Sequence, residues 1–319
     1  MIFYLSTQHD PYTLEPYLQE RGRHWRDRIK IINYEHLGRL KGLPVGTYIF
    51  TDFDRLGSNQ LNVVKQMYDH ISKVRPDLLL LNNPNHYVGR FDLLRTLYEQ
   101  GRNHFNVYRH DELDQDIRFP VFIRLERDHM GSRSTLIQNR DELNQAVVDA
   151  LMSGAASDNL MVVEFEDCRQ DDGDIRKYSV LRWGNYYAAR SVIINSDWMQ
   201  KVQPQRGIPY PSDKVAEEDK YLRTNPHLNQ VRSVFEIANI EYGRIDYGVK
   251  DGQMQVWEIN TNPRCFTPID KQIPERMHFD KLLSKRFDEG WNQIDCPHPP
   301  HPPIPFEIKQ SMFNPLVLV

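Results

Sequence analysis

Hydrophobic positions in the first third of the chain alternate between two spacings. Apolar residues within 58–74 recur every three or four positions, which predicts a helix, and a similar pattern over 91–100 predicts a second helix ended by Gly101. Short runs of β-branched and aromatic residues predict buried strands around these helices, at 2–5, 30–32, 46–51, 78–81 and 105–108. Because strands that alternate with helices favour a parallel sheet, we expect a parallel α/β lobe over residues 1–115.

Beyond a polar link, the pattern becomes that of antiparallel strands. Runs suited to strands follow one another at 120–125, 160–165, 178–180, 186–191, 243–249 and 254–259. The last two are joined by Asp251-Gly252, a dipeptide typical of a hairpin turn. Helices are predicted over 141–151, with Asn139 as the cap, and from Asn225-Pro226 onward. The expected fold class is therefore α/β, with an α+β arrangement in the C-terminal lobes.

Charge and cysteine content exclude several classes of function. The 319 residues carry a net charge of −4 and include no basic arm, so no nucleic-acid partner is expected. No apolar run reaches the ~18 residues that a membrane helix needs, so no membrane partner is expected either. The start of the chain lacks the features of a signal peptide, and the three cysteines are widely spaced. These features favour a reduced, cytoplasmic setting.

Candidate metal ligands are concentrated in the hairpin predicted at 243–259. Glu258 and Asn260 are two residues apart on one strand, so their side chains point to the same face. The turn at Asp251-Gly252 brings Asp246 of the other strand roughly opposite Glu258. Carboxylate and amide oxygens that converge in this way are typical of a Mg²⁺ site. The alternative is an ordinary two-stranded ribbon whose polar face is solvated.

This hairpin resembles the signature of the ATP-grasp superfamily. An Arg-Ile-Asp run ending at Asp246 is followed by a Glu-Ile-Asn-Thr run beginning at Glu258, as in ribosomal-protein glutamate ligases and D-alanine–D-alanine ligases. The resemblance extends in order over residues 116–266. It implies that Asp246, Glu258 and Asn260 hold Mg²⁺ between the phosphates of ATP. It also implies that Arg244 faces phosphate or the acyl substrate.

The resemblance further implies an ATP-grasp fold with a division into lobes. We expect an N-terminal pre-ATP-grasp lobe, a small lid lobe, a large lobe with the Mg²⁺ site and a proline-rich tail, at 1–115, 116–185, 186–295 and 296–319. Residues 297–305, PHPPHPPIP, are expected to end the compact fold. The final residues, 306–319, dock back or extend freely, and the sequence leaves both open. A homodimer through the first lobe is a further expectation from the resemblance.

Residues for the nucleotide can be assigned by the same resemblance. Arg124 ends a predicted strand that resembles the family strand carrying a nucleotide-binding lysine. The loop 128–134 resembles the glycine loop over the phosphates, so Gly131 and Ser132 are candidate phosphate ligands, with an ordinary polar turn as the alternative. The segment 160–167 resembles the hinge that holds the adenine edge and the ribose. The candidates in this hinge are Glu164, Phe165, Glu166 and Asp167.

Three arginines are the candidate catalytic residues. Arg176 stands in an Asp-x-Arg run that resembles one in the family, and Arg190 ends a strand whose terminal arginine faces the transferred phosphate or the substrate carboxylate. Arg244 completes the set. A planar guanidinium binds phosphate and carboxylate in bidentate fashion, which suits both roles. The alternative is that Arg176 and Arg190 are surface residues of their strands.

The sequence departs from the family pattern in its lysines. The family usually has two lysines that face the nucleotide, whereas no lysine lies between Lys73 and Lys177. Arg124 takes the place of one, and Arg109 or Arg118 would take the place of the other. Arginine keeps the positive charge but differs from lysine in geometry, which bears on how the nucleotide would sit.

The implied activity is that of an ATP- and Mg²⁺-dependent carboxylate–amine ligase. A substrate carboxylate, on a small molecule or a peptide, would be activated as an acyl phosphate and joined to an amine, with release of ADP and phosphate. One alternative is a kinase of the same fold that phosphorylates a hydroxyl. Another is a non-catalytic nucleotide-binding protein, which the missing lysines favour. The polar segment 194–225 is expected to cover the site.

Weaker candidates follow the strands predicted in the first lobe. His9-Asp10, Asp52, Asp54 and the turn 82–86 come after such strands, where ligands of α/β proteins often bind. Each either contacts substrate or caps a neighbouring helix.

Overall fold

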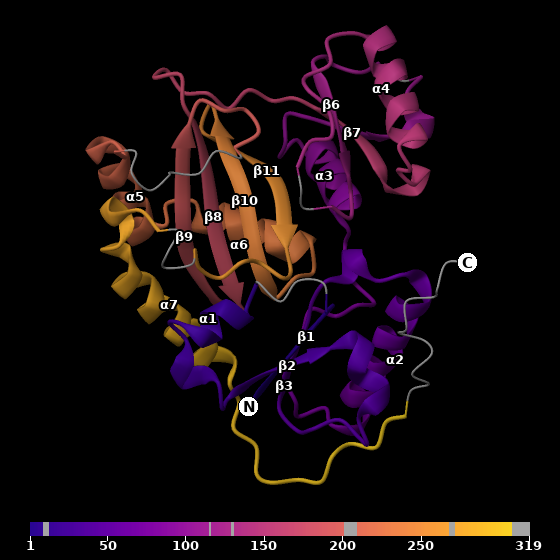
Figure 1. Cartoon of the computed structure of the whole chain (residues 1–319), viewed down its shortest axis with the longest axis vertical. Coiled ribbons are helices and arrows are strands. Elements are labelled where there is room, and N and C mark those ends of the chain that lie inside the picture. The colour runs from indigo at the N-terminus through magenta and orange to yellow at the C-terminus, as the bar shows by residue number, and fades with distance from the viewer. Residues whose placement is uncertain (9–12, 115, 129–130, 201–208, 268–271, 308–319) are drawn as a thin grey trace.

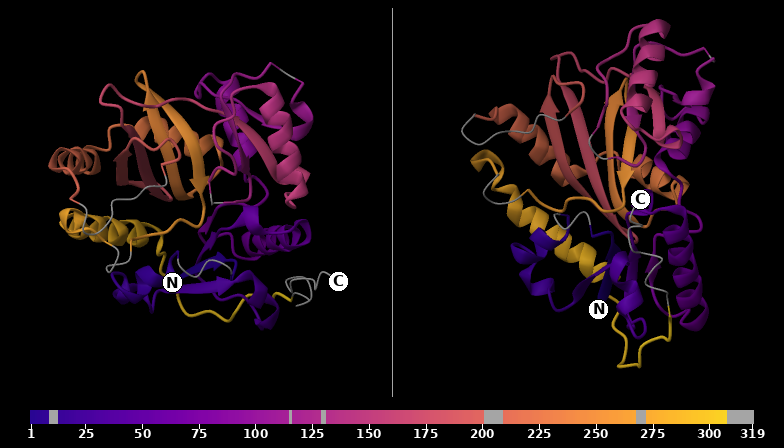
Figure 2. Two further views of the ribbon diagram at one scale, coloured as in Figure 1. Left: turned by 45° about the horizontal axis from the view of Figure 1, so that its top comes forward. Right: turned by 45° about the vertical axis from the view of Figure 1, so that its right-hand side comes forward.

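Three β-sheets and the helices around them make up the molecule (Figure 1). The computed structural model describes residues 1–8, 13–114, 116–128, 131–200, 209–267 and 272–307. A first sheet lies at one end, and a large sheet and a lid sheet lie side by side at the other end (Figures 1 and 2). Among the described helices, none combines the length and the apolar character that crossing a membrane requires.

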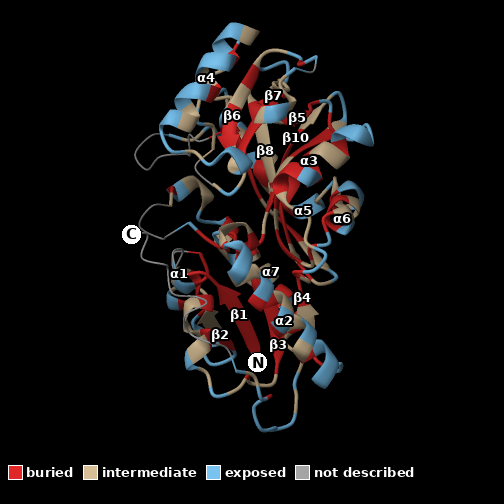
Figure 3. Cartoon of the chain, turned by 90° about the vertical axis from the view of Figure 1, so that its right-hand side faces the viewer, coloured by how far each residue is buried: buried red, intermediate tan, exposed pale blue. Residues whose placement is uncertain are grey.

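The first sheet is parallel, with strand order β2-β1-β3-β4. Its strands are β1 (Ile2–Ser6), β2 (Ile29–Asn33), β3 (Thr47–Phe50) and β4 (Leu80–Leu81). All of β1 and β3 is buried, as expected of parallel strands covered on both faces (Figure 3). Helix α1 (Glu15–Gln19) follows β1, and α2 (Ser58–Val74) buries Val64, Met67 and Ile71 against the sheet. The predicted parallel α/β lobe is confirmed.

The lid sheet is antiparallel, with strand order β5-β7-β6. It consists of β5 (Val107–Arg109), β6 (Val121–Leu125) and β7 (Leu160–Glu164), with α4 (Arg140–Met152) packed on it. The predicted cap is confirmed, since Asn139 Oδ1 accepts a hydrogen bond of 3.0 Å from the Glu142 N–H. The expected strand at 105–108 belongs to this sheet and not to the parallel one. Its residues Phe105 and Val107 pack with Met161 and Val163 of the lid, which accounts for the difference.

The large sheet is antiparallel, with strand order β11-β10-β8-β9. The strands are β8 (Ile175–Trp183), β9 (Tyr186–Asn195), β10 (Tyr242–Lys250) and β11 (Gln253–Asn260). Side chains of one face pack against α5 (Ser212–Thr224) and α6 (Leu228–Ile237), as the contacts of Tyr178 with Tyr221 and His227 show. We call the opposite face the site face; Lys177, Ser179 and Asp246 share it.

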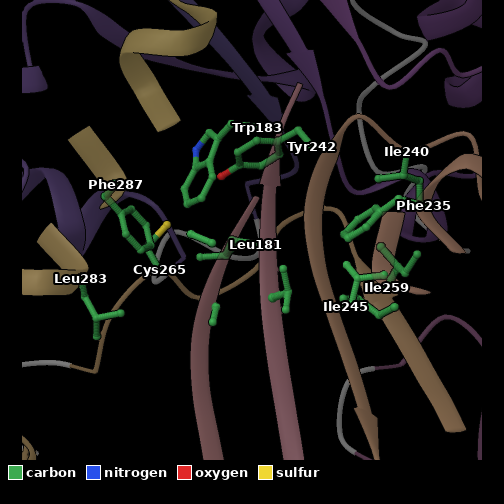
Figure 4. Packing of buried hydrophobic residues seen from close by; sticks show 14 of the residues in the cluster. Leu181, Trp183, Phe235, Ile240, Tyr242, Ile245, Ile259, Cys265, Leu283 and Phe287 are labelled. Carbon is green, nitrogen blue, oxygen red and sulfur yellow. The ribbon is translucent and has the colours of Figure 1, made fainter. Parts of the chain in front are cut away.

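One half of the site face is hydrophobic core. Trp183 packs edge-on against Phe287 and Trp291 of α7 (Phe279–Ile294), and Tyr242 packs against Tyr4 of β1 (Figure 4). Gly290 allows this close approach, since a Cβ there would lie 2.5 Å from the Trp183 ring. These contacts hold the large sheet to α7 and to the first sheet. The other half of the site face is left to line a cavity, described below.

The chain after α7 returns to the first sheet. Ile304 pairs with Leu43 through backbone hydrogen bonds of 2.7 and 2.8 Å, and it is buried in the core beside α2. The Pro305 carbonyl lies 2.8 Å from His70 Nε2. The expectation that 297–305 ends the compact fold is therefore wrong, because an isoleucine at the end of the proline run can still be buried. The final residues, 308–319, lie outside the described part of the chain.

Candidate functional site

A cavity lies between the lid sheet and the site face, with one apolar and one charged end. The apolar end is formed mainly by Leu94, Phe105, Phe122, Val163, Phe165, Trp198, Met199 and Trp257. The charged end is formed by Arg124, Gly131, Ser132, Lys177, Asp246 and Glu258. A cavity that is apolar at one end and charged at the other suits a ligand with an aromatic ring and an ionic group.

The hairpin of β10 and β11 places the predicted metal ligands together. Asp246 lies directly opposite Glu258, and Arg244 lies opposite Asn260. Since opposed residues of an antiparallel pair share a face, these four side chains all belong to the site face. This confirms the register expected from the sequence. The oxygen-only donor set of two carboxylates and one amide is of the kind that Mg²⁺ prefers.

Asp246 is buried and held by three cationic or polar neighbours. Its Oδ1 accepts hydrogen bonds of 2.8 Å from both Ser179 Oγ and Arg244 Nε, and its Oδ2 accepts one of 3.0 Å from Arg244 Nη2. Lys177 Nζ lies 3.6 Å from Oδ2. Within the described residues, no group of three His, Cys, Asp or Glu side chains suits a metal, so the third protein ligand would have to be the amide of Asn260.

Glu258 is bound by two arginines from different parts of the fold. Its Oε2 accepts hydrogen bonds of 3.0 Å from Arg90 Nη2 and of 3.1 Å from Arg124 Nη2. Arg124 lies on β6 of the lid, as expected, whereas Arg90 opens α3 (Arg90–Glu99). Arg90 Nη1 also donates to the carbonyls of Glu126, at 2.6 Å, and Asp128, at 3.0 Å. Arg90 therefore connects the glycine-loop region to a candidate metal ligand.

Sequence reasoning missed Arg90 as the second cation of this end. The alternatives it named, Arg109 and Arg118, pair with Glu126 at 2.7 Å and with Glu166 at 3.0 Å. The only signal in the sequence was an arginine at the start of a predicted helix, and many surface helices begin in the same way. Only the packing of α3 beside β11 and β5 brings this arginine to Glu258.

Two buried donors beside Glu258 have no partner. Arg90 Nε and Arg124 Nε are both shielded from solvent, and neither has a hydrogen-bond partner among the described residues. Burial, together with the nearby charge of Arg90, lowers the pKa of Arg124 to about 10. A buried unpaired donor and two adjacent guanidinium groups are both unfavourable without a ligand. An anionic ligand at this end of the cavity would relieve both.

A bulge directs Arg190 to the site face. Ser179 pairs with Ser191 and Val180 with Ala189, so Arg190 is the extra residue of β9. Its Nε donates to the Cys265 carbonyl at 2.9 Å. Burial, and then the charges of Arg276 and Arg244, lower its pKa to about 10. Arg190 therefore adds to a concentration of positive charge next to Asp246.

Arg176 is the predicted site residue that the structure does not bring to the others. Strand residues alternate between faces, so Arg176 lies on the α5 side of β8 while Lys177 lies on the site face. Arg176 donates to Glu217 Oε1 at 3.0 Å and to Asp172 Oδ1 at 2.7 Å. Lys177 lines the cavity in its place and supplies the lysine that the sequence lacks elsewhere.

The glycine-loop candidates lie at the cavity, but their hydroxyls are engaged. Gly131 and Ser132 both line it, and Ser132 forms an isolated bridge with Arg124 of β6. Ser132 Oγ donates to the Ser134 carbonyl at 2.7 Å, and Ser134 Oγ donates to the Thr135 carbonyl at 2.8 Å. In this structure the hydroxyl groups stabilise the loop itself, so contacts to a ligand would come from elsewhere.

The hinge candidates lie between the two sheets, and most of their polar groups are used internally. Glu164 Oε1 accepts from the Arg118 N–H and from Tyr108 Oη, each at 2.9 Å, and Oε2 accepts from the Asn106 N–H at 3.0 Å. Glu164, Phe165 and Glu166 line the cavity. Asp167 pairs with Arg169 at 2.8 Å. Glu164 thus ties β5 and β6 to the hinge.

Asp52 connects the first sheet to the metal-ligand hairpin. Its Oδ2 accepts from the Thr7 N–H at 3.0 Å and from Asn262 Nδ2 at 2.8 Å, and the Asn262 N–H donates to Asn260 Oδ1 at 2.9 Å. Burial raises the pKa of Asp52 to about 6. Asp52 therefore positions Asn260 through Asn262. The neighbouring candidates His9-Asp10 lie outside the described residues.

Comparison with known proteins identifies the fold. No protein-family model matches the sequence, and no curated protein matches it. The structure is similar to a D-alanine–D-alanine ligase from Bacillus anthracis complexed with ATP, with a TM-score of 0.51 and 13% identity over 92% of this chain and 96% of that chain.

Two further ligase structures are similar at lower scores. A D-alanine–D-alanine ligase from Helicobacter pylori has a TM-score of 0.49 and 11% identity over 94% of this chain and 99% of that chain. An L-amino acid ligase from Bacillus licheniformis has a TM-score of 0.41 and 11% identity over 82% of this chain and 66% of that chain. The strand order and the similarity to the Bacillus anthracis enzyme agree with the fold class predicted from the sequence. The chain therefore has the fold of the ATP-grasp ligases.

Proposed function

We propose that the protein is an ATP-dependent ligase that activates a carboxylate as an acyl phosphate and couples it to an amine. The observation that carries this proposal is the charged end of the cavity. There, Asp246 and Glu258 lie opposite each other on the site face. Cationic groups from several parts of the fold surround them, namely Arg90, Arg124, Lys177 and Arg244. Positive charge in excess of the carboxylates, with unpaired donors, suits a polyphosphate.

The two ends of the cavity match the two parts of ATP. The apolar end, with Phe122, Phe165 and Trp198 in its wall, is suited to a purine ring. The charged end, with Arg124 and the unpaired Nε of Arg90, is suited to the phosphates. Mg²⁺ would be held by Asp246, Glu258 and Asn260, where it would neutralise charge on the phosphates. The pairing of Glu258 with Arg90 and Arg124 keeps this carboxylate in place in the absence of the ion.

The chain's own residues would act by binding and orientation. Arg90 and Arg124 would bind phosphate oxygens and stabilise the negative charge that develops during transfer. Arg190 and Arg244, on the same face, would bind the acyl group that receives the phosphoryl group. An oxygen of the substrate carboxylate attacks the γ-phosphorus and ADP leaves. The amine nitrogen then attacks the acyl carbon, phosphate leaves, and the nitrogen loses a proton to solvent.

No protein nucleophile is required for this sequence of steps. Cys265, the cysteine nearest the arginines, is buried, and burial raises the pKa of its thiol to about 12. Such a thiol is a poor nucleophile near neutral pH. The rate enhancement would come from proximity and electrostatic stabilisation instead. We propose that the substrates are a small molecule or peptide bearing the carboxylate and a second molecule bearing the amine.

The first experiment is a thermal-shift titration with Mg²⁺ and ATP. A ligand at 100 times its dissociation constant stabilises the folded protein by about 2.7 kcal/mol, so the wild type should melt a few degrees higher. Glu258→Gln should lose this shift. Glu217→Gln is the matched control, because it changes a carboxylate of the opposite face that pairs with Arg176. A shift in both variants would contradict the assignment of Glu258, and no shift in a folded wild type would contradict the proposed function.

Turnover then separates the ligase from its alternatives. ADP release that needs both an acid and an amine supports the ligase. ADP release with a hydroxyl acceptor and no amine would instead identify a kinase. Tight binding of Mg²⁺–ATP without release of ADP, over a broad panel of acids and amines, would identify a non-catalytic nucleotide-binding protein.

A further inference from the structure

The segment after β9 forms one wall of the apolar end of the cavity. The ring of Trp198 lies 5.4 Å from that of Phe122 on β6 and 5.7 Å from that of Phe165 in the hinge. Met199 and Gln200 line the cavity beside it. This wall therefore joins the large sheet to the lid and the hinge, at the place where a purine ring would lie under the proposed function.

Gln200 is held in an unusual conformation within this wall. Its φ angle is 52°, in the left-handed region that few residues other than glycine adopt, and it is only 3% exposed. Its Nε2 donates to the Asp197 carbonyl at 2.6 Å, to Asn195 Oδ1 at 3.0 Å and to the Asn195 carbonyl at 3.2 Å. Because all three partners are acceptors, they fix which side of the amide carries nitrogen. The amide oxygen must then face away from Asn195 and Asp197.

The amide oxygen of Gln200 is buried without a partner. Among the side chains that line the cavity, the described residues include two buried polar atoms of this kind, Gln200 Oε1 and Arg124 Nε. Arg124 Nε is a donor at the charged end, and Gln200 Oε1 is an acceptor at the apolar end. Leaving a buried acceptor unpaired costs about 1–3 kcal/mol. A ligand that donates a hydrogen bond at this position would recover that free energy.

The hinge itself offers few free groups for the edge of a base. The Glu164 N–H donates to the Asn106 carbonyl at 3.0 Å, and the Phe165 N–H donates to the Pro120 carbonyl at 2.9 Å. The Glu164 carboxylate accepts from Tyr108, Asn106 and Arg118. Recognition of a polar base edge therefore needs another acceptor, and Gln200 Oε1 is available.

We infer that Gln200 is a specificity-determining residue that selects adenine, by accepting a hydrogen bond at Oε1 from the exocyclic amine. The inference rests on the proposed function, since it assumes that a nucleotide binds here. Adenine carries a donor at position 6, whereas guanine carries a carbonyl oxygen. With guanine, two acceptors would face each other at a buried site, which is unfavourable. Gln200 thereby favours ATP over GTP, while Trp198, Phe122 and Phe165 bind the ring without regard to its substituents.

The test compares nucleotides that differ at position 6 of the purine. Calorimetric titrations with Mg²⁺ would use ATP, purine riboside triphosphate, which has hydrogen in place of the amine, and GTP. We expect the wild type to bind ATP about tenfold more tightly than purine riboside triphosphate, the size of one hydrogen bond. Gln200→Met should weaken ATP binding about tenfold and leave purine riboside triphosphate unchanged. Gln145→Met, on the exposed side of α4, is the matched control and should keep the full preference.

The outcomes separate this inference from the proposed function. Equal binding of ATP and purine riboside triphosphate by the wild type overturns the role of Gln200 and needs no variant, so a misfolded Gln200→Met leaves the test intact. A folded Gln200→Met that keeps the tenfold preference overturns it as well. Either result leaves the ATP site standing. A wild type that binds none of the three nucleotides overturns the proposed function, and the inference with it.

Discussion

The two faces of the large sheet treat charge in opposite ways. On the helix-covered face, Arg176 is matched by Asp172 and Glu217, and its hydrogen bonds to Asp172 contribute most to raising its pKa. Across the cavity from the site face, Arg124 shares one carboxylate with Arg90, and burial lowers its pKa to about 10. The first arrangement is complete as it stands. The second is complete only with an anion, so the contrast separates a stabilising ion pair from a binding site.

Turnover should show the largest difference between the faces. Arg124→Met removes a charge that would stabilise the transferring phosphoryl group, so we expect ATP-dependent turnover to fall about 100-fold or more. Arg176→Met, the matched variant on the other face, should change turnover less than twofold. Steady-state ADP release measures both. Comparable losses in the two variants would remove the distinction drawn between the faces.

The pH dependence of stability should show the next largest effect, through Asp52. Its pKa of about 6 is raised from 3.8, so the folded state holds a proton that the unfolded state has lost between these values. Stability should therefore be highest below about pH 4 for this group and fall as pH rises to about 6, by about 3 kcal/mol. Asp52→Asn should remove this decline. Urea melts from pH 4 to 7 test this, and an unchanged slope in the variant would contradict it.

The smallest expected effect is a difference in the sign of stability changes. Arg124→Met removes a buried charge that lies beside another guanidinium, so the free energy of unfolding should stay the same or rise by up to about 1 kcal/mol. Arg176→Met breaks a satisfied, partly exposed ion pair and should lower it by up to about 1 kcal/mol. Denaturant melts without nucleotide compare the two. A clear loss of stability in Arg124→Met would show that this arginine serves the fold.

The position of the site was predictable wherever the chemistry is local in sequence. The Asp-Gly turn and the alternation of polar residues placed Asp246 opposite Glu258, and the pairing of β10 with β11 agrees. Arg124 reached Glu258 from its own predicted strand. Arg176 and Lys177 could not be told apart, because adjacent strand residues point to opposite faces and the sequence does not say which face is covered by helices.

Long-range packing decided the remaining features. Arg90 reaches Glu258 across 168 positions of the chain, and Gln200 obtains its orientation from a turn that no periodicity marks. The strand at Val107–Arg109 joined the lid sheet, since its apolar side chains found partners on β7. Ile304 after the proline run found a place in the core of the first sheet. Each of these depends on surfaces that exist only when distant segments have packed.

Sequence alone determined the parallel first sheet, the hairpin and the set of oxygen ligands, because hydrophobic period and turn chemistry act between near neighbours. Tertiary structure decided which cations meet these ligands, which face of the large sheet is open, and where a buried acceptor is left unpaired. These properties depend on desolvation and on charges brought together from separate strands and helices, and neither effect is visible in a linear pattern of residues.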